Sequence, residues 1–265
     1  MLIKIKPVLQ LFFAALTRPV ATVLLLAAVS NFPAQSALLV FSNSDIMATT
    51  SSLHPNSAAA AASFDAAVAL LGGSSLVDFE LAPLGSFNNL TVATGVTIAG
   101  TDRNSANHTI RNTTGFPPAP TLDGYNTTSG GANFVEMVGG TLTFTFATPV
   151  QAFGAYFSGI QTAFFADVIT FSDGGSQTLL IPGAGTTNSI GALAFLGFTD
   201  VGRSISSITI TASNANGADA IGVDDVRFQA ASTTPEPSSF GLVLGGLFAA
   251  VGYRRRGLSR SGTGL

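Results

Sequence analysis

Apolar and polar positions alternate with a period of two along most of the chain from residue 76 onward. Leu142, Phe144 and Phe146 are separated by threonines, and the same alternation recurs at residues 76–80, 152–157 and 206–211. Successive side chains of a strand point to opposite faces, so this pattern predicts strands with one buried face.

Turn-forming residues separate these apolar stretches. The clearest are Gly139-Gly140, Asp173-Gly174-Gly175 and Asn216-Gly217, which favour tight connections between antiparallel strands. We count about nine strands without helical crossovers, which indicates an antiparallel sandwich rather than a parallel α/β sheet. The expected fold class is mainly β, a jelly-roll-like antiparallel β-sandwich ectodomain over residues 76–231.

A different pattern precedes the strands, in an N-terminal segment over residues 37–75. Residues 56–73 are rich in alanine, with Asn56 or Ser57 as an expected cap and Gly72-Gly73 as the expected end. Phe64, Val68 and Leu71 recur at helical spacing. We predict a short helix that packs on the core, with a mobile arm as the alternative.

The first 36 residues have the pattern of a signal peptide. Lys4 and Lys6 come first, residues 20–29 are apolar, and Ala34-Gln35-Ser36 supplies small residues for cleavage before Ala37. We therefore expect export by the Sec machinery. A retained membrane anchor is the alternative.

Charge is distributed unevenly along the 265 residues. The overall charge is −3, yet residues 38–234 contain four arginines, no lysine and 13 acidic residues. Such a surface repels phosphates and argues against nucleic-acid binding. The chain has no cysteine, so neither disulfides nor cysteine chemistry contributes.

The acidic stretch AIGVDDVRF, residues 220–228, interrupts the alternation. Ile221 and Val223 share one phase and Val226 and Phe228 the opposite phase, which predicts a β-bulge at Asp224-Asp225. A bulge can turn both carboxylates to one edge, where Asp78 and Glu80 are expected to join them if the first and last strands of the sandwich are neighbours. Hard cations favour such oxygen ligands, so a Ca²⁺ site at Asp78, Glu80, Asp224 and Asp225 is one interpretation. The alternative is that these carboxylates are solvated or pair with Arg203 and Arg227.

Signatures of catalysis are absent from the sequence. The two histidines, His54 and His108, lie far apart, neither H-E-x-x-H nor G-x-S-x-G occurs, and nothing marks out one carboxylate pair. We therefore expect a non-enzymatic protein. Sugar-binding faces often use tyrosine or tryptophan, and Tyr125 and Tyr156 are candidate ligand-binding residues, with ordinary surface tyrosines as the alternative.

The C-terminal residues 232–265 combine three features. Pro235-Glu236-Pro237 precedes an uncharged apolar run of 14 residues, 240–253, and Arg254-Arg255-Arg256 follows it. As a helix the run spans ~21 Å, less than the ~30 Å of a bilayer core. We predict a hydrophobic transmembrane helix at about residues 238–253, anchored on the cytoplasmic side by the arginines.

This order of features resembles the PEP-CTERM sorting domain of Gram-negative bacteria, over about 30 residues. The resemblance implies that Pro235, Glu236 and Pro237 form the recognition motif and that an exosortase processes the tail. It also implies an inner-membrane anchor that is transient or retained, in bacteria that make exopolysaccharide. More loosely, Gly222, Val223, Asp224, Asp225 and Val226 resemble the G-[IV]-D-D-[IV] strand of sandwich ectodomains in this family.

Together these features predict an exported protein of the cell envelope, outer surface or extracellular matrix, associated with exopolysaccharide or biofilm. A carbohydrate-binding module with a defined glycan ligand is the alternative, and a secreted glycan-active hydrolase is a third interpretation.

Overall fold

The computed structural model describes residues 38–49, 53–113, 124–161, 168–172, 176–184, 191–212 and 219–230. All of them fall within one compact unit, Gln35–Ala231. The expected signal peptide at 1–36 and the expected sorting tail at 232–265, with its hydrophobic helix, lie outside the described residues and stay predictions.

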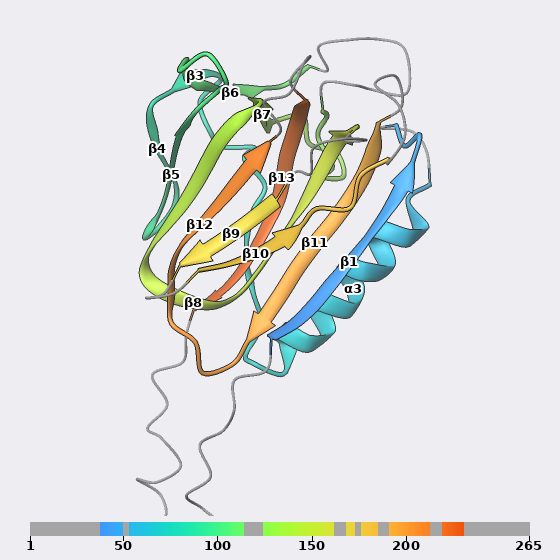
Figure 1. Ribbon diagram of the computed structural model, residues 1–265, viewed down its shortest axis with the longest axis vertical. Coiled ribbons are helices and arrows are strands. Elements are labelled where there is room, and N and C mark those ends of the chain that lie inside the picture. Colours follow the sequence, from blue (N-terminus) through green and yellow to red (C-terminus); the bar gives the residue numbers. More distant parts are fainter. Residues whose placement is uncertain are drawn as a thin grey trace, which may run out of the picture. The chain divides into compact units, whose positions relative to one another are not determined.

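One long strand organises the sheet. β8 (Gly140–Ile160) has 21 residues. Its first part pairs with β5 (Val96–Thr101) and β12 (Ile205–Ala212), and its second part pairs with β11 (Ala192–Asp200) and β13 (Ala220–Ala230). β8 therefore passes from one layer of strands into the other (Figure 1).

The remaining strands extend these two layers. In the first layer, β4 (Asn89–Ala93) lies beside β5, and β9 (Val168–Ser172) and β10 (Ser176–Leu180) continue beyond β12. In the second layer, β1 (Leu38–Ile46) lies beyond β11, and β2 (Ser75–Val77) pairs with β13. β13 also pairs with β7 (Phe134–Val138), which is followed outward by β6 (His108–Arg111) and then β3 (Gly85–Phe87). Every pairing among the described strands is antiparallel. The expected mainly β, antiparallel, sandwich-like fold is confirmed.

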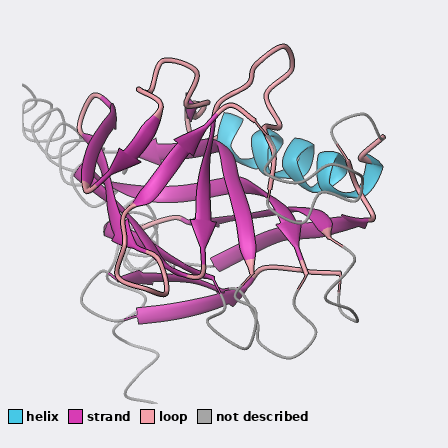
Figure 2. Cartoon of the chain, turned by 90° about the horizontal axis from the view of Figure 1, so that it is seen from above, coloured by secondary structure: helices cyan, strands magenta, loops and turns pink. Residues whose placement is uncertain are grey.

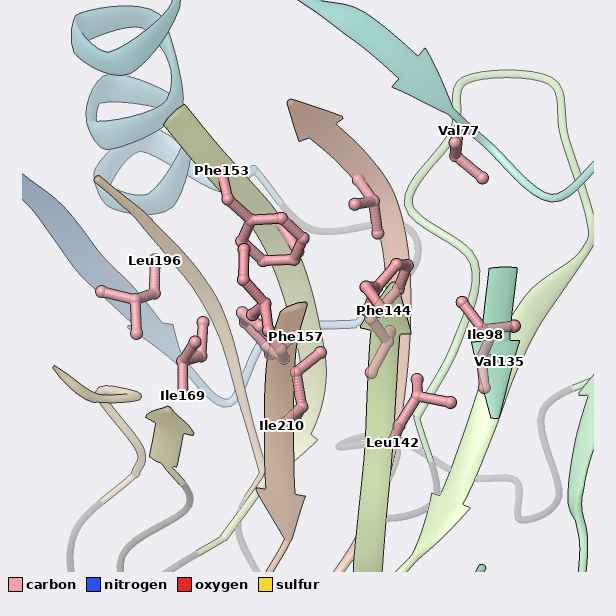
Figure 3. Packing of buried hydrophobic residues seen from close by; sticks show 14 of the residues in the cluster. Val77, Ile98, Val135, Leu142, Phe144, Phe153, Phe157, Ile169, Leu196 and Ile210 are labelled. Atoms are coloured by element: carbon pink, nitrogen blue, oxygen red, sulfur yellow. The ribbon is translucent and has the colours of Figure 1, made fainter. Parts of the chain in front are cut away.

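The core lies between the layers. Figure 3 shows Leu142 and Phe144 from the first part of β8 near Phe153 and Phe157 from its second part. All four are fully buried, as is Ile210 of β12. The alternation that predicted these strands reflects this burial, because apolar surface removed from water contributes about 25 cal/mol per Å².

A single described helix, α3 (Pro55–Ala69), covers the outer face of the second layer (Figure 2). Phe64 and Val68 are fully buried and pack with Phe195 of β11. The rings of Phe64 and Phe195 fit against the sheet because Gly154 and Gly197, which are register partners on β8 and β11, have no side chains. A Cβ at either glycine would lie 2.8 Å from a phenyl ring atom. The expected helix and the burial of Phe64 and Val68 are therefore confirmed, whereas Leu71, the third residue of the predicted face, follows the end of the helix at Ala69 and is half-buried. Strand β11 is buried on both faces.

The start of α3 differs from the expectation. His54, not Asn56 or Ser57, is the N-cap residue, and it makes no side-chain cap bond. Asp45 of β1 caps the helix from outside, because its carboxylate accepts hydrogen bonds from the amides of Asn56 at 3.0 Å and Ser57 at 2.8 Å. Burial opposes ionisation of this carboxyl, but the bonds from Ser57 and Asn56 outweigh it and lower the pKa of Asp45.

Two further details depart from the sequence analysis. The segment 37–75 contains strand β1 as well as the helix, and β1 pairs with β11 over nine positions. The strand expected at residues 76–80 ends at Val77, because Phe79 has a φ of 56° and the chain turns there. Within the described residues, no helix is long and apolar enough to cross a membrane.

Candidate functional site

The predicted bulge is present in β13. Asp224 pairs with Tyr156 of β8, whereas Arg227 pairs with Gly154, so the register shifts between the two acidic positions and Arg227. Asp225 has a φ of 48°, in the left-handed region that asparagine and aspartate tolerate better than most residues. The bulge brings the Asp224 and Asp225 carboxylates to one place.

Both carboxylates bind the same loop, residues 125–133. Asp224 Oδ2 accepts hydrogen bonds from the Thr127 amide at 2.7 Å, the Thr127 hydroxyl at 3.0 Å and the Thr128 amide at 3.2 Å. Asp225 accepts from the Thr128 hydroxyl at 2.8 Å and the Thr127 hydroxyl at 3.2 Å. The bulge therefore anchors the centre of the loop.

Asp224 lies in an unusual environment for a carboxyl group. It is 0% exposed, and its Oδ1 is buried without a hydrogen-bond partner. Burial raises the pKa of Asp224 to about 7, and the charge of Asp225 adds to the rise, while the bonds from Thr127 oppose it. The group is therefore partly protonated near neutral pH.

The second acidic pair follows β2, which pairs with β13 through Val77 and Val226. The expected closeness of the two segments is thus confirmed. Glu80 accepts hydrogen bonds from the side chain of Asn126 at 2.8 Å and from the amides of Ala132 and Asn133 at 2.9 and 3.0 Å. Glu80 consequently holds both ends of the 125–133 loop, whereas Asp78 accepts a hydrogen bond from the Glu80 amide at 3.2 Å.

Calcium binding at these four carboxylates stays a prediction. In the part of the chain that the structure describes, no group of three or more acidic or histidine side chains has the arrangement of a metal site. Oxygens of Glu80, Asp224 and Asp225 accept hydrogen bonds from the loop instead. Arg227 and Arg203, the alternative partners, form ion pairs with Asp65 and Asp200.

The loop forms one wall of a cavity of about 830 Å³. Other lining residues come from the start of α3 and from the segment after β6. Among the described residues the lining consists of His54, Asn112, Thr113, Tyr125, Asn126, Thr127, Thr128, Ser129, Gly130, Gly131, Ala132 and Phe134. None of these is a carboxylate, a lysine or an arginine, so hydroxyl, amide and backbone groups dominate.

Close backbone packing fixes the point where the loop begins. Ser158 of β8 donates its hydroxyl to the Tyr125 carbonyl and accepts from the Tyr125 amide, both at 2.7 Å. Gly124 has a φ of 77°, and a Cβ there would lie 2.1 Å from the Gly222 nitrogen. Only glycine fits this position.

The two candidate tyrosines lie in different places. Tyr125 lines the cavity, but it is 1% exposed and its hydroxyl is buried without a partner. Tyr156 is not among the lining residues, because its ring contacts Phe195 at 5.2 Å and Arg227 at 5.4 Å beside α3. Burial raises the pKa of both hydroxyls. The buried ring of Tyr125 therefore offers no free face to stack on a sugar, and Tyr156 is half-buried outside the described lining.

Sequence reasoning did not identify Asn126, Thr127, Thr128 or Asn133 as parts of the site. The available signal was the polar run YNTTSGGAN, residues 125–133, in the segment 101–131, whose Asn, Thr, Gly and Pro content predicts a long loop. The structure differs from that prediction, because strand β6 lies within this segment.

Comparison with known proteins gives structural likenesses only. No protein-family model and no curated protein matches the chain. TmCBM61, solved in complex with β-1,4-galactotriose, superposes with a TM-score of 0.30 and 10% identity, over 58% of this chain and 94% of the other.

Catalytic domains of GH87 α-1,3-glucanases superpose as well. One, in complex with nigerose, has a TM-score of 0.29 and 16% identity over 58% of this chain and 31% of its own. The catalytic unit of the thermostable enzyme from Streptomyces thermodiastaticus strain HF3-3 has a TM-score of 0.25 and 16% identity over 56% and 27%. We take no ligand and no activity from superpositions at this level.

Proposed function

We propose that this chain is an exported, non-enzymatic bacterial surface or matrix protein whose β-sandwich binds extracellular polysaccharide in the cavity beside the 125–133 loop. The observation that carries the proposal is the cavity itself, about 830 Å³ in volume, whose described lining is largely polar and contains no carboxylate, lysine or arginine. That volume is within the range of small-molecule sites.

The lining suits a saccharide better than an apolar ligand. Asn112, Thr113 and Ser129 are exposed at the cavity and present amide and hydroxyl groups, which match the hydroxyl groups of a sugar. The 125–133 loop, to which Ser129 belongs, is held by Glu80, Asp224 and Asp225 rather than free to collapse. A preorganised wall lowers the entropic cost of binding. Because the wall is preorganised, it favours a carbohydrate-binding module with one defined glycan ligand over general association with polysaccharide.

Binding is a better proposal than hydrolysis. Glycosidases need two carboxyl groups on either side of the scissile bond, and the described lining contains none. Asp224 and Asp225 are buried and bonded to Thr127 and Thr128. They are therefore occupied in holding the loop. We also propose that the strands of the sandwich have the specific arrangement of a jelly roll.

Sorting to the surface is the second part of the proposal. The signal-peptide pattern of the first 36 residues supports export by the Sec machinery. Pro235-Glu236-Pro237 and Arg254-Arg255-Arg256, which resemble a PEP-CTERM tail, support a transient or retained inner-membrane anchor and processing by an exosortase. The resulting location is the cell envelope, outer surface or matrix of a Gram-negative bacterium.

Glycan binding by the full chain, purified in mild detergent, tests the first part. We expect the protein to retain at least one polysaccharide on an array of bacterial and plant glycans. Ala132→Trp places a large side chain at an exposed position of the cavity and should abolish retention. Val201→Trp, at an exposed turn that does not line the cavity, should leave it unchanged. Equal retention by both variants contradicts the assignment of the site.

A further inference from the structure

The 125–133 loop directs most of its backbone donors into the protein. Counted within the described residues, six of its nine N–H groups donate internally, and their acceptors are the Ser158 hydroxyl, the Asp224 and Glu80 carboxylates and the Thr128 carbonyl. Counted in the same way, three of its nine carbonyls accept, and these belong to Tyr125, Thr128 and Asn133. The backbone left for a ligand is therefore richer in acceptors than in donors.

The loop's side chains show the same bias. The Thr127 and Thr128 hydroxyls each have one hydrogen, and each donates it to Asp224 or Asp225. Both amide hydrogens of Asn126 are used, one on Glu80 Oε1 and one on the Asn133 carbonyl, each at 2.8 Å. What remains on these three residues is the oxygen lone pairs of two hydroxyls and of one amide.

We infer that the cavity selects saccharides rich in hydrogen-bond donors, favouring amino sugars with a free ammonium group over neutral sugars and rejecting uronates. This inference rests on the proposed function and names the ligand class of that same site. A ligand that faces a wall of hydrogen-bond acceptors must donate hydrogen bonds to it, and an ionised carboxylate group cannot donate.

Charge acts in the same direction as the hydrogen bonds. The Glu80 and Asp225 carboxylates accept hydrogen bonds from the loop, Asp224 adds only a partial charge near neutral pH, and no lysine or arginine is among the described lining residues. An ammonium group is attracted by this field and a uronate is repelled. Asn112, Thr113 and Ser129 can donate or accept, so they add affinity without changing the preference.

Calorimetric titration of the full chain with three matched oligosaccharides tests the inference. The probes are glucosamine oligomers, N-acetylglucosamine oligomers of the same length, and polygalacturonate oligomers. We expect affinities in that order, with the uronate roughly tenfold weaker than the neutral oligomer because it meets acceptors and like charge. Added salt should weaken only the glucosamine complex.

A positive charge introduced at the exposed Ser129 supplies an internal control. Ser129→Lys should strengthen uronate binding and weaken glucosamine binding, whereas Ser176→Lys, at an exposed position of β10 outside the lining, should change neither. Uronate binding as tight as or tighter than the other two probes overturns the inference and leaves glycan binding intact. No binding of any glycan to the wild type, here or on the array, overturns the proposed function itself.

Discussion

Asp224 Oδ2 accepts a hydrogen bond from the Thr127 amide at 2.7 Å, although the two residues are 97 positions apart in the sequence. The bond joins the bulge of the last strand to the loop that lines the cavity. Through it, a buried carboxylate that is not among the described lining residues positions the wall of the proposed binding site.

The charge of Asp224 should make the protein's stability depend on pH. The folded pKa of about 7 lies above the ordinary 3.8, so the folded state binds more protons between these values and stability falls as pH rises through that window. Asp224→Asn keeps an acceptor oxygen for Thr127 and removes the charge. We expect its melting temperature to exceed that of the wild type by about 3 °C at pH 8, and the difference to shrink at pH 5.

Melting curves of both proteins from pH 4 to 8 measure this difference. Asp45, whose pKa is lowered, contributes stability that is lost only as pH falls below its ordinary value. Its titration therefore does not overlap the Asp224 window. A difference between wild type and variant that stays constant across the range rules out titration of Asp224.

Removal of the Thr128 hydroxyl should destabilise the loop and its anchor. Thr128→Val has nearly the same shape, but it leaves Asp225 Oδ1 without its donor at 2.8 Å. The expected loss is about 1–2 kcal/mol in the free energy of unfolding, measured by denaturant titration. Thr128→Ser keeps the hydroxyl and should lose less than half as much. Equal losses in the two variants mean that the hydroxyl contributes nothing.

Much of the fold was predictable because its signals are local. Phe144 and Phe157 alternate with small or polar residues, and the change of phase in AIGVDDVRF indicated the bulge at Asp224. The site was predicted only in part, since its carboxylates were identified but not what they hold. Thr127 and Thr128 meet Asp224 through the tertiary fold, and no spacing in the sequence marks a contact over 97 positions.

Long-range partners explain the other misses as well. Asp45 caps α3 from a neighbouring strand, so the helix start has no capping side chain of its own and its sequence suggested Asn56 or Ser57 instead. Strand β1 begins with a continuous apolar run and was not recognised, because its identity as a strand depends on pairing with β11.

Calcium binding at Asp78, Glu80, Asp224 and Asp225 has a direct thermal test. An ion that binds only the folded state at 100 times its dissociation constant stabilises it by about 2.7 kcal/mol. If the site exists, calcium added to chelator-treated full chain raises the melting temperature and Asp224→Asn removes most of the shift. A shift no larger than that with magnesium or sodium chloride shows that these carboxylates serve only as anchors of the loop.

Processing of the tail is expected to remove the arginines. The short apolar run and Pro235-Glu236-Pro237 predict a mature protein in the envelope that lacks residues 254–265, as measured by intact mass. Glu236→Ala should accumulate the unprocessed form. A mature wild-type species that still carries Arg254 contradicts processing.

Hydrogen exchange of the loop amides tests the anchoring by Glu80 and Asp224 most directly. In the wild-type full chain the amides of Thr127, Thr128, Ala132 and Asn133 should be protected, since each donates to a carboxylate. Glu80→Ala should release the last two and Asp224→Ala the first two by at least tenfold in rate, about 1.4 kcal/mol, while β11 stays protected. Unchanged exchange at all four amides in both variants would show that the carboxylates do not hold the loop.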